Sequence, residues 1–217
     1  MQSKKNRSTE RRLRAALREV TPSVLLRERA VILRLGAKAG PIYARLRLLD
    51  SLGLYAHNKS QIRPNAKSFL FVCFGNIMRS PMAEALFRKS ILEANLDVYA
   101  CSAGTHAVAG NRPDPRALAA SEEMGASLAE HRAQPLTARL IEQADAIFAM
   151  DFQNKAELLT RYPEHREKIH LLSAYGDGAQ RYREIADPYS GDLETTRACY
   201  AYLQICIRNL TAELIRR

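Results

Sequence analysis

The sequence predicts an α/β fold: a four-stranded parallel doubly wound sheet with helices on both faces, preceded by a basic helical extension. After residue 67, short apolar runs alternate with longer segments of helical periodicity, which is typical of a parallel sheet covered on both faces. The formal charge changes sign near the same residue. We therefore divide the chain into residues 1–67, an extension and linker, and residues 68–217, an α/β domain.

The elements of the α/β domain follow from apolar periodicity and from turn residues. Its 150 residues bury enough apolar surface to fold alone. We expect strands over 68–73, 97–102, 145–150 and 168–173. We expect helices near 81–94, 114–124, 136–143, 152–161 and 192–216. Asp114 and Pro115 suit the N-cap and the first position of the second helix. A ligand of such a fold binds at the carboxyl ends of the strands.

The extension carries the positive charge of the chain. Residues 1–67 contain 16 Lys or Arg and 4 Asp or Glu, a formal net of +12, whereas the rest has 17 minus 19, or −2. No uncharged run is long enough to span a bilayer. Such a region binds an anionic membrane surface, nucleic acid or an acidic protein, or it packs on the α/β domain or on a second subunit. The sequence leaves these partners open.

The extension also has helical periodicity. We expect a first helix around residues 13–20 and a second that opens at Thr21-Pro22 and closes near Gly36. A third, with apolar residues between 42 and 49, ends before Gly53. Residues 56–67 have the composition of a linker.

Most of the candidate catalytic and phosphate-binding residues lie in one segment, residues 72–84, with the sequence Val-Cys-Phe-Gly-Asn-Ile-Met-Arg-Ser-Pro-Met-Ala-Glu. A cysteine ends a strand, a glycine lets the backbone turn sharply, and Ser80-Pro81 opens a helix with Ser80 as N-cap. Backbone N–H groups and the helix dipole then attract a phosphate dianion and favour a thiolate at Cys73. Arg79, six positions later, can grip two phosphate oxygens. The stretch predicts a phosphate cradle with a nucleophile in its floor.

Other side chains of this loop have supporting roles in the hypothesis. Ser80 is expected to hydrogen-bond the sulfur and make it a better leaving group, and Asn76 to brace the loop. The phosphate-binding or substrate-binding residues that we predict are Phe74, Gly75, Asn76, Ile77, Met78, Ser80 and Tyr189. Taken alone, a cysteine that ends an apolar strand is equally well explained as a small buried residue.

A proton donor for the leaving group is expected in Asp187-Pro188-Tyr189. A carboxylic acid near the leaving oxygen accelerates such a reaction by about 100 to 10,000 fold. Pro188 stiffens the loop, and Tyr189 can form an aromatic wall beside a substrate ring. Asp-Pro by itself is a common turn opener, which leaves a structural role for Asp187 open.

Residues 72–81 with Ala83-Glu84-Ala85 resemble the signature of the low-molecular-weight protein-tyrosine phosphatases. The resemblance covers residues 68–217. Its other landmarks are Ser102–Thr105, Arg112–Arg116, His131–Gln134 and Asp145–Asp151. It implies hydrolysis of phosphotyrosine through a cysteinyl-phosphate, with Cys73, Arg79 and Asp187 as catalytic residues. As in that family, the acid follows the cysteine, here by 187 minus 73, or 114, residues.

The resemblance also bears on the substrate. Ile77 matches the phosphotyrosine branch, whereas the phosphoarginine phosphatases carry threonine there. Residues 102–110 look more like the bacterial exopolysaccharide-linked phosphatases, which implies the tyrosine-rich tail of a bacterial kinase as substrate. Two alternatives stay open: a noncatalytic phosphate-sensing or docking protein, and an enzyme similar to arsenate reductase. Met78 and the lack of a cysteine from 145 to 152 argue against the reductase.

Four cysteines, at positions 73, 101, 199 and 206, form no CxxC pair, and no signal peptide is apparent. We expect a reducing cytoplasm, with a membrane-peripheral location open through the extension. Cys199 and Cys206 share a helix face and are expected in the core. Cys101 is expected as a buried structural cysteine, and a resolving role for it stays open. The five histidines show no metal spacing, so we expect neither a metal nor a cofactor. His131 either helps to hold the phosphate loop or is structural.

Overall fold

The computed structural model describes residues 23–54 and 62–217. The helix expected around residues 13–20 lies outside the described residues, as does most of the expected linker. Among the described helices, none is long and apolar enough to cross a membrane.

One sheet forms the centre of the structure. Its strands are β1 (Ser68–Cys73), β2 (Tyr99–Gly104), β3 (Ala146–Ala149) and β4 (Ile169–Leu171). They lie in the order β2-β1-β3-β4, and every pair is parallel, which confirms the predicted four-stranded parallel sheet. The chain leaves β1 toward β2 on one side and later returns to β3 on the other. The strand order therefore reverses between β1 and β3, and ligands of open α/β sheets bind at such a point.

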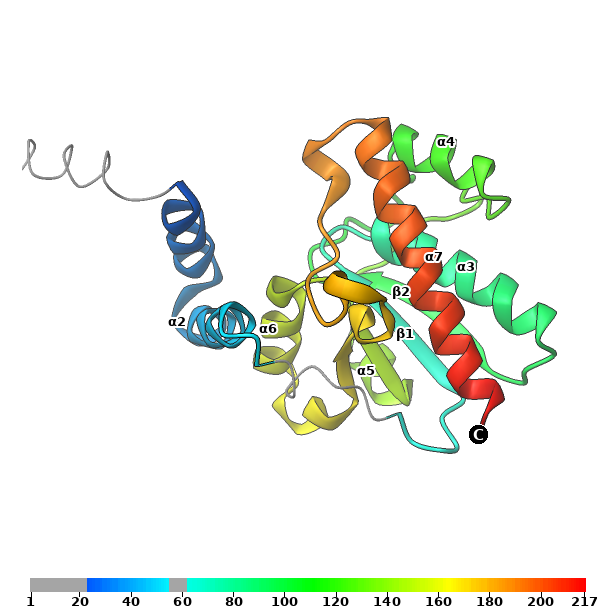
Figure 1. The fold of residues 1–217 in the computed structure, drawn as a ribbon, viewed down its shortest axis with the longest axis horizontal. Coiled ribbons are helices and arrows are strands. Elements are labelled where there is room, and N and C mark those ends of the chain that lie inside the picture. The colour runs from blue at the N-terminus through cyan, green and yellow to red at the C-terminus, as the bar shows by residue number, and fades with distance from the viewer. Residues whose placement is uncertain (1–22, 55–61) are drawn as a thin grey trace, which may run out of the picture.

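Helices cover both faces of the sheet, as predicted (Figure 1). On one face lie α3 (Arg79–Glu93) and α7 (Leu193–Ile215), with α4 (Pro115–Glu123) packed on α7. On the other lie α5 (Ala138–Gln143) and α6 (Phe152–Arg161), and α2 (Ser23–Ser51) packs on α6. Short 3-10 turns complete the fold: η2 (Pro163–Lys168), η3 (Leu172–Tyr175), η4 (Gly178–Gln180) and η5 (Pro188–Ser190).

The core on each face follows from the alternation of side chains along β1. Phe69, Phe71 and Cys73 point toward α3 and α7, whereas Leu70 and Val72 point toward α5 and α6. All of these side chains are buried, so β1 reads as a continuous apolar run. Cys206 is fully buried in the same layer as Phe71, and Cys199 packs against it, which confirms the core role expected for both cysteines.

The second and fourth strands differ most from their predicted bounds. The N–H of Val98 bonds to Leu96 O in a local turn, so pairing with β1 begins only at Tyr99. The same strand continues to Gly104, two residues beyond its predicted end at residue 102. The fourth strand ends at Leu171 because the chain turns there into η3.

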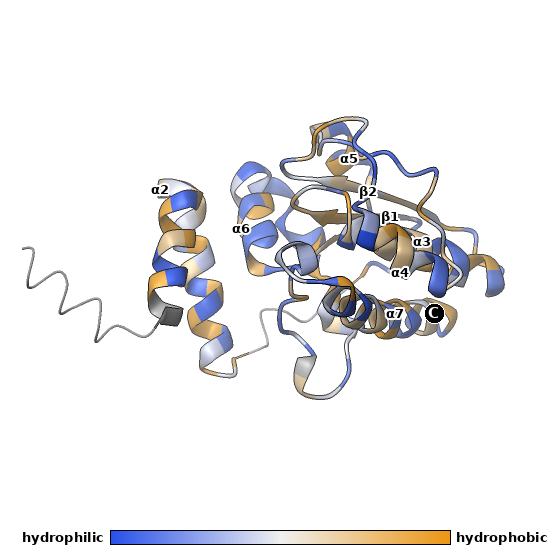
Figure 2. Ribbon diagram, turned by 90° about the horizontal axis from the view of Figure 1, so that it is seen from above, coloured by the Kyte–Doolittle hydropathy of each residue, from blue (hydrophilic) through white to orange (hydrophobic). Residues whose placement is uncertain are grey.

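The α2 segment corresponds to the second and third helices expected in the extension. It is kinked at Gly36, whose φ of 72° and ψ of −172° are not helical, close to where the sequence predicted an end. Tyr43 and Leu46 are buried in the core layer that also contains Leu70 and Val72 of β1. Figure 2 shows α2 beside α6 from a second direction. The described part of the extension therefore packs on the α/β domain, one of the alternatives that the sequence left open.

Candidate active site

The loop between β1 and α3 forms the floor of the site. Helix α3 begins at Arg79 with Met78 as its N-cap and no capping side chain, so the prediction that Ser80 caps this helix was wrong. The Ser80 hydroxyl lies against the sulfur of Cys73 instead. Pro81 is accordingly the third helical residue, which is tolerated because N–H groups of a first turn have no acceptor within the helix.

Cys73 is buried at the carboxyl end of β1, where the side chain is 3% exposed. Its Sγ lies 3.0 Å from Ser80 Oγ and accepts a hydrogen bond from the N–H of Asn76 at 3.2 Å. Asn76 Nδ2 donates to Ser80 Oγ at 2.9 Å, so the Ser80 hydroxyl hydrogen can point at the sulfur. This arrangement suits a negative charge on sulfur.

Asn76 also fixes the shape of the loop. Its φ of 54° lies in the left-handed region, which asparagine tolerates better than most residues. The side chain donates to Ser102 Oγ and accepts from the Gln134 N–H, each at 2.9 Å. His131 Nε2 lies 2.9 Å from the Asn76 carbonyl oxygen. Asn76 thus makes the contacts by which we expected it to brace the loop, and His131 contacts the loop, which fits one of the two roles left open for it.

Arg79 is buried and bound by two carboxylates. Its Nη1 donates to Asp151 Oδ2 at 2.7 Å and to the Ile185 carbonyl at 3.0 Å, and its Nη2 donates to Asp187 Oδ2 at 2.7 Å. Burial disfavours the charged guanidinium, but Asp151 and Asp187 outweigh it and raise the pKa of Arg79. Arg79 therefore stays a cation at the mouth of the loop.

Asp151 is a site residue that the sequence analysis named only as a family landmark. It follows β3 directly and caps α6, accepting from the Asn154 N–H at 2.7 Å. Because β3 lies beside β1, its carboxyl end brings Asp151 to Arg79. A carboxylate directly after a predicted buried strand was the available signal.

Asp187 lies at the start of η5, on the segment opposite the loop. Its Oδ1 accepts from the Tyr189 N–H at 3.2 Å, and Tyr189 is 61% exposed beside it. Arg116 at the start of α4 donates to the Tyr189 carbonyl at 3.0 Å and to that of Gly191. Asp114, the predicted N-cap of α4, accepts from Arg116 N and Nη2 and thereby orients this arginine.

Cys73, Arg79 and Asp187 line one cleft of about 260 Å³. Phe74, 43% exposed, stacks on His106 with ring centroids 4.5 Å apart and forms one wall, and Tyr189 forms another. The lining residues are Cys73, Phe74, Gly75, Ile77, Met78, Arg79, His106, Val108, Asn111, Asp187 and Tyr189. Of the predicted site residues, only Asn76 and Ser80 do not line the cleft. His106, Val108 and Asn111, which lie on the loop after β2, also line the cleft and were not among the predicted site residues.

Cys101 cannot serve as a partner for Cys73 in this fold. In the sheet register Cys101 pairs with Leu70 and Cys73 pairs with Gly104, so the two side chains lie on opposite faces. Burial also raises the pKa of the Cys101 thiol to about 11. The resolving role that the sequence left open for Cys101 is therefore wrong, and it is a structural cysteine.

Comparison with known proteins extends this description. Residues 68–217 match the family model of the low molecular weight phosphotyrosine protein phosphatases. The chain is 34% identical to a protein-arginine-phosphatase of Bacillus subtilis over 67% of this chain and 95% of the relative. It is 40% identical to the probable low molecular weight protein-tyrosine-phosphatase EpsP of Ralstonia nicotianae over 58% of this chain and 81% of that protein.

A solved structure of the YwlE arginine phosphatase, a mutant with a phosphorylated active-site serine in place of cysteine, superimposes with a TM-score of 0.64. It is 33% identical and covers 68% of this chain and 95% of its own. The chain belongs to the low molecular weight phosphotyrosine protein phosphatase family. It is an enzyme, a phosphoric monoester hydrolase of the protein-tyrosine-phosphatase class.

Proposed function

We propose that this enzyme hydrolyses phosphotyrosine in proteins through a cysteinyl-phosphate on Cys73. One observation carries the proposal: a buried cysteine with two hydrogen-bond donors, a buried arginine and an exposed carboxylate meet at a single aromatic-walled cleft. The phosphorylated active-site residue of the YwlE mutant supports a covalent intermediate at the corresponding cradle.

In the proposed first step Cys73 Sγ attacks phosphorus, and the bond to the tyrosine oxygen breaks. Asp187 gives its proton to that oxygen, so tyrosine leaves as a neutral phenol. In the second step Asp187 takes a proton from water, the water oxygen bonds to phosphorus, and the sulfur leaves as a thiolate. Arg79 and the backbone N–H groups of residues 74–79 hold the phosphate oxygens in both steps.

The walls of the cleft support phosphotyrosine over phosphoarginine. Phe74 and Tyr189 offer two exposed aromatic surfaces to a flat ring. Ile77 lines the cleft where the resembled phosphoarginine phosphatases carry a hydroxyl. The relative EpsP, together with the resemblance of residues 102–110, supports a bacterial tyrosine kinase of exopolysaccharide synthesis as the substrate.

The proposal is tested by the dependence of Asp187→Asn on the leaving group. The variant should slow phosphorylation of Cys73 by about 100 fold or more with a phosphotyrosine peptide, and much less with an ester whose leaving group needs no proton. Cys73→Ser should fold and show no turnover. Equal losses for both esters would remove Asp187 from this role, and turnover by Cys73→Ser would remove the nucleophile.

We further propose that the extension contacts acidic residues beside the phosphotyrosine, the acidic-protein alternative among its partners. A cavity of about 280 Å³ shares Phe74 and His106 with the active-site cleft and is also lined by Arg34 and Lys38 of α2. Glu157 is its one acidic lining residue and is already bound by His106 at 3.0 Å and by Arg161 at 3.2 Å. A positive surplus therefore adjoins the cleft, where the substrate chain must leave it.

Peptides with acidic and neutral flanks around one phosphotyrosine test this contact. Arg34→Gln with Lys38→Gln should raise KM several fold for the acidic peptide alone and leave a small aryl phosphate unaffected. Arg29→Gln, an exposed charge elsewhere on α2, is the matched control. Equal effects on both peptides would contradict the contact but not the hydrolysis, since the aryl phosphate reports hydrolysis separately.

A further inference from the structure

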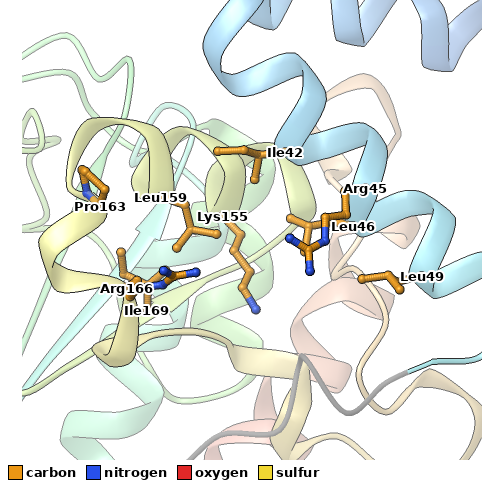
Figure 3. Close-up of a pocket in the computed structure, with 9 residues that line it drawn as sticks. All are labelled: Ile42, Arg45, Leu46, Leu49, Lys155, Leu159, Pro163, Arg166 and Ile169. Carbon is orange, nitrogen blue, oxygen red and sulfur yellow. The ribbon is translucent and has the colours of Figure 1, made fainter.

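A third cavity, of about 450 Å³, lies between α2 and the segment from α6 to β4. None of its lining residues lines the cleft at Cys73. Figure 3 shows its lining side chains, which come from these two parts of the chain. They are Ile42, Arg45, Leu46, Leu49, Lys155, Leu159, Pro163, Arg166 and Ile169. The cavity is therefore formed jointly by the extension and the α/β domain.

Three cations line this cavity, and no acidic side chain does. Lys155 of α6 is 5% exposed, and burial lowers its pKa to about 8. Arg45 of α2 and Arg166 of η2 are exposed, and Figure 3 shows their guanidinium groups reaching toward the space beside the Lys155 amine. A cavity lined by cationic side chains and by no acidic side chain attracts an anion.

The remaining walls are apolar. Ile42, Leu46 and Leu49 recur at spacings of four and three residues, so they share one face of α2. Leu159 and Ile169 face them from α6 and β4. These walls favour a ligand with an aliphatic body over a fully hydrated ion such as free phosphate.

We propose that this cavity binds an aliphatic anion, with its head group among Arg45, Lys155 and Arg166 and its chain against the leucine and isoleucine side chains. A carboxylate or phosphate head matches the fork of an arginine and the point charge of a lysine. Because the ligand touches both α2 and the α/β domain, it favours the docked position of α2 by mass action. The site is separate from the cleft at Cys73 and does not depend on the proposed substrate.

Calorimetric titration of the full chain with monomeric decanoate tests the proposal. Acetate, which has the carboxylate without the long chain, and decanol, which has the chain without the charge, are the controls. A carboxylate probe avoids the tetrahedral oxyanion cradle of the active site. Decanoate should bind with one-to-one stoichiometry and at least about tenfold more tightly than either half, equivalent to about 1.4 kcal/mol. It should also raise the midpoint of thermal unfolding.

Variants locate the binding. Arg45→Gln with Arg166→Gln should weaken decanoate about tenfold or more, whereas Arg139→Gln, an exposed arginine of α5 outside the cavity, should not. Lys155→Met should act like the arginine pair; if it does not fold, the surface pair still decides the outcome. No decanoate binding below about 1 mM, equally tight binding of decanol, or unchanged binding in the arginine pair would each overturn the proposal.

Discussion

At the residue scale, the site depends on two small polar side chains behind the cleft wall. Ser80 and Asn76 are fully buried, and between them they connect the sulfur of Cys73 to Ser102 and Gln134. Neither side chain lines the cleft. Their effect on the reaction must pass through the charge on sulfur and the shape of the loop.

Ser80→Ala should slow the breakdown of the phosphoenzyme more than its formation. The hydroxyl lies 3.0 Å from Cys73 Sγ, where it would stabilise the thiolate that departs in the proposed second step. A hydrogen bond to a charged group contributes about 1.5 to 3 kcal/mol, so kcat should fall about 10 to 100 fold. Rapid-mixing kinetics with an aryl phosphate should show a larger burst of phenol than in the wild type. Ser80→Thr, which keeps the hydroxyl, is the control, and a smaller burst in Ser80→Ala would contradict this role.

At the element scale, the important junction is between α2 and the segment that leads to Asp187. Arg47 of α2 donates to Glu184 at 3.0 Å and to Glu28 at 2.7 Å. Glu184 accepts the Phe152 N–H at 2.9 Å, one residue after Asp151. Ile185, the next residue, binds Arg79 through its carbonyl. Two hydrogen bonds, Arg47 to Glu184 and Arg79 to the adjacent Ile185, thus connect the extension to the guanidinium of Arg79.

Glu184→Gln should flatten the dependence of stability on pH. Burial first, and then the charge of Asp151, raise the pKa of Glu184 to about 7 from an ordinary 4.5. Between these values the folded protein holds a proton that the unfolded chain has released, so the free energy of unfolding falls as pH rises through this window. The variant should lose about 3 kcal/mol of this fall. Urea unfolding from pH 4.5 to 8 measures it, with the exposed Glu167→Gln as control, and an unchanged slope would contradict the assignment.

At the scale of the whole molecule, the chemistry and the charge lie in different parts of the chain. The formal charge of +12 is in residues 1–67, and the cleft is built from residues after 67. The division at residue 67 remains a prediction. Ile62 and Ala66 are buried in the same core layer as α3 and α7, and Arg217 donates to the Ile62 carbonyl at 2.8 Å. A truncation should therefore keep Ile62.

Removal of residues 1–61 should leave hydrolysis of a small aryl phosphate within about threefold of the full chain, equivalent to less than 1 kcal/mol. The reason is that no residue of the extension lines the active-site cleft within the part that the structure describes, residues 23–54 and 62–67. Stability should fall, because the surface that contacts Tyr43 and Leu46 becomes exposed. Steady-state kinetics and circular dichroism together measure both effects. A folded truncation that loses activity more than about tenfold would show that α2 orders the acid loop, and Arg47→Met in the full chain would then reproduce part of the loss.

The sequence by itself determined the fold class and the main chemistry of this protein. Apolar periodicity placed every strand and helix of the α/β domain within a few residues, because burial on both faces of a parallel sheet leaves a continuous apolar run. A phosphate-binding loop over residues 73–81 could be predicted equally well, because a loop of this kind is contiguous in the chain. Local capping was less secure: Ser80 suited an N-cap, but its hydroxyl bonds to the sulfur.

Tertiary structure alone decided which distant residues meet. The reversal of strand order between β1 and β3 brings Asp151 to Arg79, 72 positions earlier, and the loop after β2 brings His106 beside Phe74. The docking of α2 on α6 created the cavity of Arg45, Lys155 and Arg166. Contacts of this kind depend on how strands and helices pack across the chain, and periodicity within a segment carries no information about its neighbours in space.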